Sequence, residues 1–168
     1  MQSLQSNPGC MGRLLQLLAG GGATGKGASS GDGPWPYRRR KYLLSRAEFS
    51  FFRVLQSVAL ENGWVVCAKV NLNDLLYLEK GAENRMAWLN KINRKHADFV
   101  LCDAQTMQPV MVVELDDKCH QSASAQKRDG VKDRALAAAG LPIVRVKAAK
   151  GYEPAAVRDK LANGLASA

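Results

Sequence analysis

The chain has 168 residues, of which 46% are hydrophobic and 23% charged, a composition that predicts a soluble globular domain with a tail. Its apolar runs are far shorter than the roughly 18 to 20 residues that a membrane-spanning helix needs, and Met1 to Gly20 lacks the features of a secretory signal, so we expect a cytoplasmic protein. Because 24 basic residues outnumber 15 acidic ones and give a net charge of +9, a polyanion, and nucleic acid above all, is the expected partner; a basic protein without such a partner is the alternative.

Residues 1–33 are predicted to be a disordered leader, and residues 34–168 to form the folded domain. The segment 20–33, GGGATGKGASSGDG, is rich in glycine and small polar residues, which is typical of flexible linkers. The spacing from Gly20 to Lys26 also fits the start of a phosphate-binding loop. That motif requires Ser or Thr after the lysine and a strand before the loop, and the segment has neither.

The domain is predicted to open with a basic arm, PWPYRRRKY, at 34–42. Its prolines favour an extended backbone, which leaves four consecutive cations available for phosphate groups. We expect these cations to bind nucleic acid, and a solvated basic arm is the alternative. They are Arg38, Arg39, Arg40 and Lys41.

Helix and strand patterns alternate in the rest of the chain. Residues 45–63 carry apolar side chains at helical spacing and begin with the capping-box pair Ser45 and Glu48. Segment 72–81 is ambiguous, and the third long helix is expected to be broken, or to begin, near Gly130. Further helices are expected at 82–94, 124–140 and 153–165, and strands at 64–70, 97–103, 109–116 and 141–148. The fold class is therefore α/β (α+β), with a central mixed sheet of about four strands and flanking helices.

The two central strands are predicted to form a hairpin around the five-residue break at 104–108. A symmetric pairing sets Asp103 opposite Pro109 and therefore Asp98 opposite Glu114. Directly opposed residues share a face and hold their Cβ atoms about 4.5 to 5.5 Å apart, so these two carboxylates would repel each other unless a cation lies between them. A slip of one residue would move the pair to opposite faces.

This patch is predicted to bind a divalent metal ion. Asp98 and Glu114 supply oxygen ligands, which Mg²⁺ (or Mn²⁺) prefers, and such an ion activates water and neutralises charge on a phosphodiester. Alternate residues on a strand share a face, which adds His96 and Asp116 to the patch, although we expect His96 to be a bystander. Purely structural pairing of the acids with a cation such as Arg145 or Lys147 is the alternative.

The segment from Tyr42 to Ala148 resembles the domain of unknown function 2726 (DUF2726) family, itself placed among the PD-(D/E)XK, restriction-endonuclease-like proteins. The matching stretches are LLSRAEFSFFRVL, KHADFVLCD, PVMVVELDDKCH and RDGVKDRALAAAGLPIVRV. The resemblance implies a restriction-endonuclease-like core of a helix, a three-stranded antiparallel unit, a helix and a strand. It also implies that Asp98 and Glu114 are the metal ligands of a nuclease and that Glu48 joins them, with a capping role alone as the alternative for Glu48.

One position departs from the pattern of that superfamily, which has a lysine where this chain has Asp116. An acid there, followed by a histidine, is similar to domains related to the very-short-patch repair endonucleases, in which other groups share the work of the lysine. The candidates here are His120, as general base, phosphate contact or third ligand, and Lys132 on the following helix, which we prefer to Lys118. The alternative for Lys132 is an exposed cation paired with Asp129.

The expected function is that of a magnesium-dependent nuclease-fold domain that binds DNA and is a candidate for hydrolysing its phosphodiester bonds. A noncatalytic nucleic-acid-binding module on a degenerate nuclease scaffold is the alternative, and the missing lysine favours it. The expected catalytic residues are Glu48, Asp98, Glu114, Asp116, His120 and Lys132.

Overall fold

A computed structural model describes residues 35–116 and 123–167, with the side chains of residues 35–116 and 130–167. The leader predicted at 1–33 lies outside the described residues. Residues Arg40–Ala168 form one compact unit, to which all the helices and strands given below belong. None of these helices has the length and apolar composition that crossing a lipid bilayer requires.

The first helix, α1 (Arg46–Glu61), begins at the predicted capping box. The Ser45 hydroxyl accepts a hydrogen bond from the Glu48 N–H at 3.2 Å, and the Glu48 carboxylate accepts one from the Ser45 N–H at 2.7 Å. The helix ends before Gly63, whose φ of 70° is a conformation that glycine adopts without steric cost. Its apolar face buries Phe51, Leu55, Val58 and Ala59.

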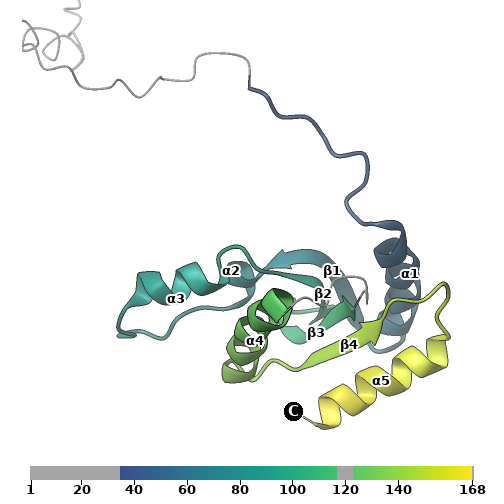
Figure 1. The fold of residues 1–168 in the computed structure, drawn as a ribbon. Coiled ribbons are helices and arrows are strands. Elements are labelled where there is room, and N and C mark those ends of the chain that lie inside the picture. Colours follow the sequence, from purple (N-terminus) through teal and green to yellow (C-terminus); the bar gives the residue numbers. More distant parts are fainter. Residues whose placement is uncertain (1–34, 117–122, 168) are drawn as a thin grey trace, which may run out of the picture. The chain divides into compact units, whose positions relative to one another are not determined.

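Within the described residues, four strands form one mixed sheet in the order β1-β2-β3-β4 (Figure 1). The first three strands are antiparallel, and the last is parallel to its neighbour. This arrangement confirms the predicted fold class. The strands are β1 (Trp64–Asn71), β2 (His96–Asp103), β3 (Pro109–Asp116) and β4 (Ile143–Lys147).

The described residues contain four helices in addition to α1. The ambiguous segment contains a single turn of helix, and the helix expected at 82–94 is shorter than predicted. The break expected near Gly130 is wrong, because the helix continues through this residue; a glycine inside a helix costs only about 0.5–1 kcal/mol relative to alanine. These helices are α2 (Leu72–Leu75), α3 (Arg85–Ile92), α4 (Ala123–Ala138) and α5 (Pro154–Ala166).

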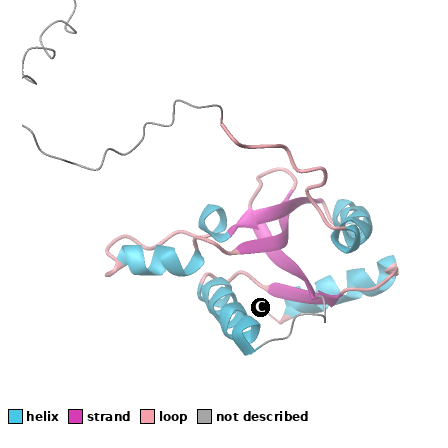
Figure 2. Ribbon diagram, turned by 45° about the horizontal axis from the view of Figure 1, so that its top comes forward, coloured by secondary structure: helices cyan, strands magenta, loops and turns pink. Residues whose placement is uncertain are grey.

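The sheet has a hydrophobic core on each face. On one face, side chains of α1 and α5 pack against alternate strand residues such as Phe99 and Leu101. On the other, side chains of α2, α3 and α4 pack against the intervening residues, such as Val100 and Cys102. Figure 2 shows α1 and α5 on one side of the strands and α4 on the other. The alternation of β2 therefore sets which helix each strand residue meets.

The predicted register of the central hairpin is right at one end and wrong at the other. Phe99 pairs with Val113, as the symmetric pairing requires, but a bulge after Leu101 places Pro109 opposite Cys102 instead of Asp103. Asp103, the last residue of β2, also holds the loop, because its carboxylate accepts hydrogen bonds from the N–H groups of Gln105 and Thr106.

Candidate functional site

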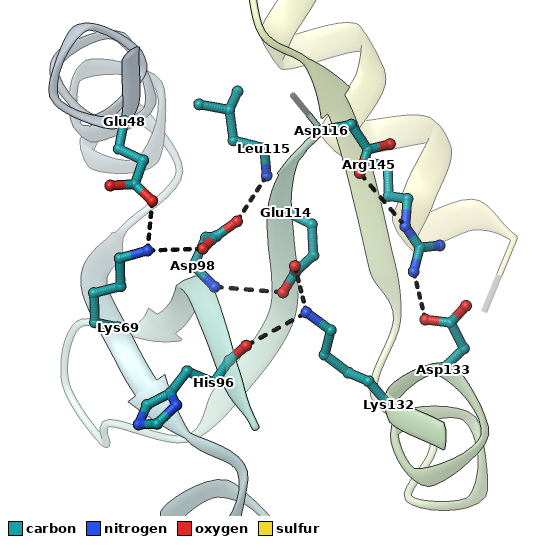
Figure 3. A network of polar contacts seen from close by, with 10 residues as sticks. All are labelled: Glu48, Lys69, His96, Asp98, Glu114, Leu115, Asp116, Lys132, Asp133 and Arg145. Atoms are coloured by element: carbon teal, nitrogen blue, oxygen red, sulfur yellow. Dashed lines mark hydrogen bonds and ion pairs between the residues drawn. The ribbon is translucent and has the colours of Figure 1, made fainter. Parts of the chain in front are cut away.

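The site lies where β2 and β3 separate. Beyond the Phe99–Val113 pair, side chains replace the backbone ladder: the Asp98 N–H donates to Glu114 Oε1 at 3.3 Å, and the Leu115 N–H donates to Asp98 Oδ2 at 3.1 Å. Each carboxylate thus reaches across to the opposite strand (Figure 3). The two acids therefore lie side by side, as the predicted register requires.

Glu114 is the only buried charged residue in the described part of the chain, with 8% of its surface exposed. Its Oε2 atom lies 2.5 Å from Nζ of Lys132, which reaches it from α4. The same ammonium group donates to the His96 carbonyl at 3.3 Å. Burial raises the pKa of Glu114 above its ordinary value, although Lys132 opposes the rise. The structure thus pairs Lys132 with a site acid, while the Asp129 side chain lies outside the described residues.

A second lysine, Lys69 of β1, joins two acids of the site. Its ammonium group donates to Asp98 Oδ1 at 2.9 Å and also to Glu48 Oε1 (Figure 3). Burial tends to lower the pKa of Lys69, but these hydrogen bonds outweigh that effect and raise it. Lys69 is not among the predicted site residues. The signal for it is that Lys69 is the one charged residue in the apolar strand WVVCAKV.

At Lys69, the side chains of β1 stop alternating regularly between the two faces of the sheet. Cys67 and Val70 both pack into the core on the α4 side, whereas Ala68 packs into the core on the α1 side. In a regular strand, residues three apart lie on opposite faces. The change coincides with a φ of 57° at Lys69, a left-handed conformation that is rare for residues other than glycine. This backbone turns the lysine toward Glu48 on α1.

Glu48 uses its two carboxylate oxygens for different partners. Oε2 accepts the capping hydrogen bond from the Ser45 N–H, while Oε1 accepts from Lys69. Burial tends to raise the pKa of Glu48. The hydrogen bonds from Lys69 and Ser45 outweigh this effect, so the pKa of Glu48 lies below the ordinary value. Glu48 therefore caps α1 with one carboxylate oxygen and contacts Lys69 of the site with the other.

Two residues expected on the same patch are not brought into it. Asp116 is exposed and lies 3.9 Å from the Arg145 guanidinium. That guanidinium lies closer, at 2.5 Å, to Asp133. The His96 ring is exposed and contacts the Asn71 amide at 3.3 Å. The pairing of β3 with β2 ends at Val113, whereas its pairing with β4 continues to Asp116.

The remaining predicted residues are two positions that follow β3 in the chain and the basic arm at 38–41. His120 and Lys118 lie outside the described residues. The side chains of residues 38–41 are exposed, so they are accessible to a polyanion. Within this arm, the Arg38 guanidinium donates to the Tyr37 carbonyl at 2.9 Å.

The donor set fits a hard divalent ion. Asp98 and Glu114 offer oxygen atoms only, and each carboxylate oxygen has two lone pairs, of which one accepts a hydrogen bond in this structure. Among the described residues, no three His, Cys, Asp or Glu side chains converge as a metal site. Mg²⁺ is commonly held by one or two carboxylates together with waters and substrate phosphates, so the Asp98–Glu114 pair is sufficient for it.

The profile of a protein family of unknown function, DUF2726, matches residues 40–164. The chain belongs to the DUF2726 family. The DUF2726 region contains Glu48, Lys69, Asp98, Glu114 and Lys132. The chain is also similar to the uncharacterized protein y4bI of Sinorhizobium fredii (strain NBRC 101917 / NGR234), with 32% identity over 108 residues, which cover 63% of this chain and 74% of that protein. No solved structure matches the chain significantly.

Proposed function

We propose that this DUF2726 protein is a nuclease-fold domain of the PD-(D/E)XK superfamily that binds DNA and hydrolyses its phosphodiester bonds with Mg²⁺ or Mn²⁺. The observation that carries the proposal is the convergence of Asp98 and Glu114 where β2 and β3 separate. Two carboxylates at one point of a sheet, with a lysine beside them, suit the chemistry of a phosphodiester.

In this proposal, Asp98 and Glu114 hold the ion, and Glu48 supports the site from α1. When bound, the ion supplies charge neutralisation at the phosphate and a lowered pKa for an attacking water. Lys132, at 2.5 Å from Glu114, provides a fixed positive charge for the negative charge that develops on the phosphate. Its position beside Glu114 supports the expectation that it takes over the work of the lysine that Asp116 replaces.

The charge of the chain supports the choice of nucleic acid as the substrate. A net charge of +9 attracts a polyanion, and neutralising phosphates with Lys and Arg releases counterions and gives salt-dependent binding. Residues 38–41 form an exposed run of cations suited to such contacts. They carry no information about base sequence, because phosphate contacts position a protein without specifying a site.

We place this activity in the cytoplasm. Cys67 and Cys102 lie on the neighbouring strands β1 and β2 as free thiols. Free thiols are the usual state of cysteines in a reducing compartment, which supports that location.

A noncatalytic nucleic-acid-binding module is the second candidate. Each of the four oxygens of Asp98 and Glu114 already accepts a hydrogen bond. This favours the second candidate, because such a hydrogen-bonded pair can serve only to connect β2, β3 and α4. In that case the protein would bind nucleic acid without cleaving it.

Cleavage assays separate the two candidates. The full chain is incubated with supercoiled plasmid, single-stranded DNA or RNA in Mg²⁺ or Mn²⁺, and product is measured for the wild type, Asp98→Asn and Glu114→Gln. We expect both variants to lose activity by about 100-fold or more, the scale of losing one catalytic electrostatic group. Glu61→Gln, an exposed carboxylate of α1 paired with Arg158, is the matched control and keeps wild-type activity.

The absence of product with every metal and substrate, together with salt-dependent binding that persists, would contradict the nuclease and support the module. Cleavage that survives both acid substitutions would show that the catalytic site lies elsewhere.

A further inference from the structure

Lys69 has no assigned task in the proposed nuclease, yet it makes the central contacts of the site. Its ammonium group lies between carboxylates from two separate elements, Glu48 on α1 and Asp98 on β2. These residues are 21 and 29 positions away in the chain. The fold therefore brings one cation to a point that two acids share.

The position of Lys69 comes at a backbone cost. A left-handed conformation is unfavourable for an L-residue, and Lys69 adopts it with φ 57° in the middle of β1. Its neighbours Ala68 and Val70 remain paired with Phe99 and Ala97, so the strand absorbs the change locally. Strain of this kind persists only where the surrounding structure stabilises the strained conformation. Here the ion pairs with Glu48 and Asp98 supply that stabilisation.

The same oxygens are ligands for a divalent ion. Asp98 Oδ1 and Glu48 Oε1 both contact Nζ of Lys69, so one point in the structure already lies within hydrogen-bond distance of two carboxylate oxygens. A cation of higher charge at that point would gain both acids as ligands. An ammonium group and a divalent ion cannot occupy the same point, so their binding at that point is mutually exclusive.

We propose that Lys69 is a built-in competitor of the metal: its ammonium group holds Glu48 and Asp98 together in the metal-free protein, and a divalent ion acquires Glu48 as a third carboxylate ligand only by displacing it. This role rests on the proposed metal-dependent function. In this structure Lys69 stands between two of the three acids. The apparent affinity for metal equals the intrinsic affinity multiplied by the fraction of time that Lys69 leaves the point free.

The test measures Mn²⁺ binding to the full chain by calorimetry, without nucleic acid. Lys69→Met is expected to bind Mn²⁺ about 10-fold more tightly than the wild type, the factor that applies if the ammonium occupies the point about nine-tenths of the time. Lys69→Arg keeps the charge and is expected to bind no more tightly than the wild type. Lys147→Met removes an exposed charge from the end of β4 and controls for the net charge of the protein.

Thermal unfolding adds a readout that is independent of calorimetry. Without metal, Lys69→Met is expected to melt below the wild type, because Glu48 and Asp98 are left unpaired. Saturating Mn²⁺ is expected to raise its melting temperature more than that of the wild type. Lys69→Gln, which retains a hydrogen-bond donor without the charge, serves the same comparison if the methionine variant does not fold.

Equal Mn²⁺ affinity in the wild type, Lys69→Met, Lys69→Gln and Lys147→Met would overturn the competitor role and leave the metal-dependent function standing. A lack of Mn²⁺ binding by the wild type and all variants would overturn both. Binding by the Lys69 variants alone would support the competitor role in its strongest form.

Discussion

At the scale of single residues, Glu48 shows why a capping role and a site role do not exclude each other. A carboxylate has two oxygens, and here one accepts from the Ser45 backbone while the other accepts from Lys69. The N-terminal position on α1 also favours a negative charge, because the helix dipole is positive there. A residue that completes a capping box can therefore also contribute to a site formed by distant elements.

The ionisation of Glu48 leads to a prediction about pH. Burial opposes its charge, but hydrogen bonds from Lys69 and Ser45 hold its pKa below the ordinary value of 4.5, so the charged form stabilises the folded state. That contribution is present above pH 4.5 and is lost as the pH falls through the pKa of the folded state. Replacing Glu48 by Gln is expected to lower the free energy of unfolding by about 1–2 kcal/mol at neutral pH.

The measurement is urea denaturation of the wild type and Glu48→Gln across a pH series in the presence of a chelator. The difference between them is expected to shrink as the pH falls below 4.5. A difference that stays constant over this range would mean that the charge of Glu48 does not contribute.

At the scale of elements, α1 depends on its first turn. Its buried face packs against the sheet, and its start determines where Glu48 lies relative to Lys69. The capping box satisfies N–H groups that otherwise lack a partner at a helix N-terminus. The cap therefore contributes to stability and also to the geometry of the site.

Ser45→Ala is expected to lower the free energy of unfolding by about 1 kcal/mol, the usual cost of losing an N-cap. Ser57→Ala, an exposed position inside the same helix, is the matched control, and it is expected to be neutral or slightly stabilising because alanine favours helices. Urea denaturation of both variants checks this. Equal effects at the two positions would show that the cap does not stabilise α1.

At the scale of the whole molecule, the C-terminal helix closes one face of the sheet. Val157 and Leu161 of α5 are buried in the core that also contains Val144 of β4. Gly164 brings the helix close to the strand, because a Cβ atom at this position would lie 2.2 Å from Cγ2 of Val144. Valine has little rotamer freedom, so the contact cannot be relieved by a simple side-chain rotation.

Gly164→Ala is therefore expected to destabilise the protein by about 1–3 kcal/mol, although alanine normally favours a helix. Gly151→Ala, where an added Cβ meets no atom within 4 Å, is the control. The double variant with Val144→Ala is expected to lose less stability than the two single changes together, because the clash is removed. Thermal unfolding is measured for the wild type and these four variants. A double variant whose loss of stability equals the sum of the two single losses would contradict the contact.

The elements and the pairing of Asp98 with Glu114 could be predicted from the sequence because their signals are local. The capping box marks the start of α1, periodicity marks the strands, and a short loop sets the register of a hairpin. The prediction failed at Asp103, where the carboxylate binds the turn and a bulge shifts the register at that end. The predicted register holds from Phe99 to Leu101 because the bulge lies beyond Leu101.

Only the tertiary structure decided which cations meet these acids. Lys69 reaches Glu48 across 21 positions of the chain, and Lys132 reaches Glu114 across 18. No periodicity encodes such contacts, because they depend on how α1 and α4 pack against opposite faces of the sheet and on one left-handed residue in β1. Strand alternation alone also gave no indication that Asp116 meets Arg145 of β4 instead of the cations that meet the other acids. The sequence by itself determined the acids, whereas the packing of distant elements determined their partners.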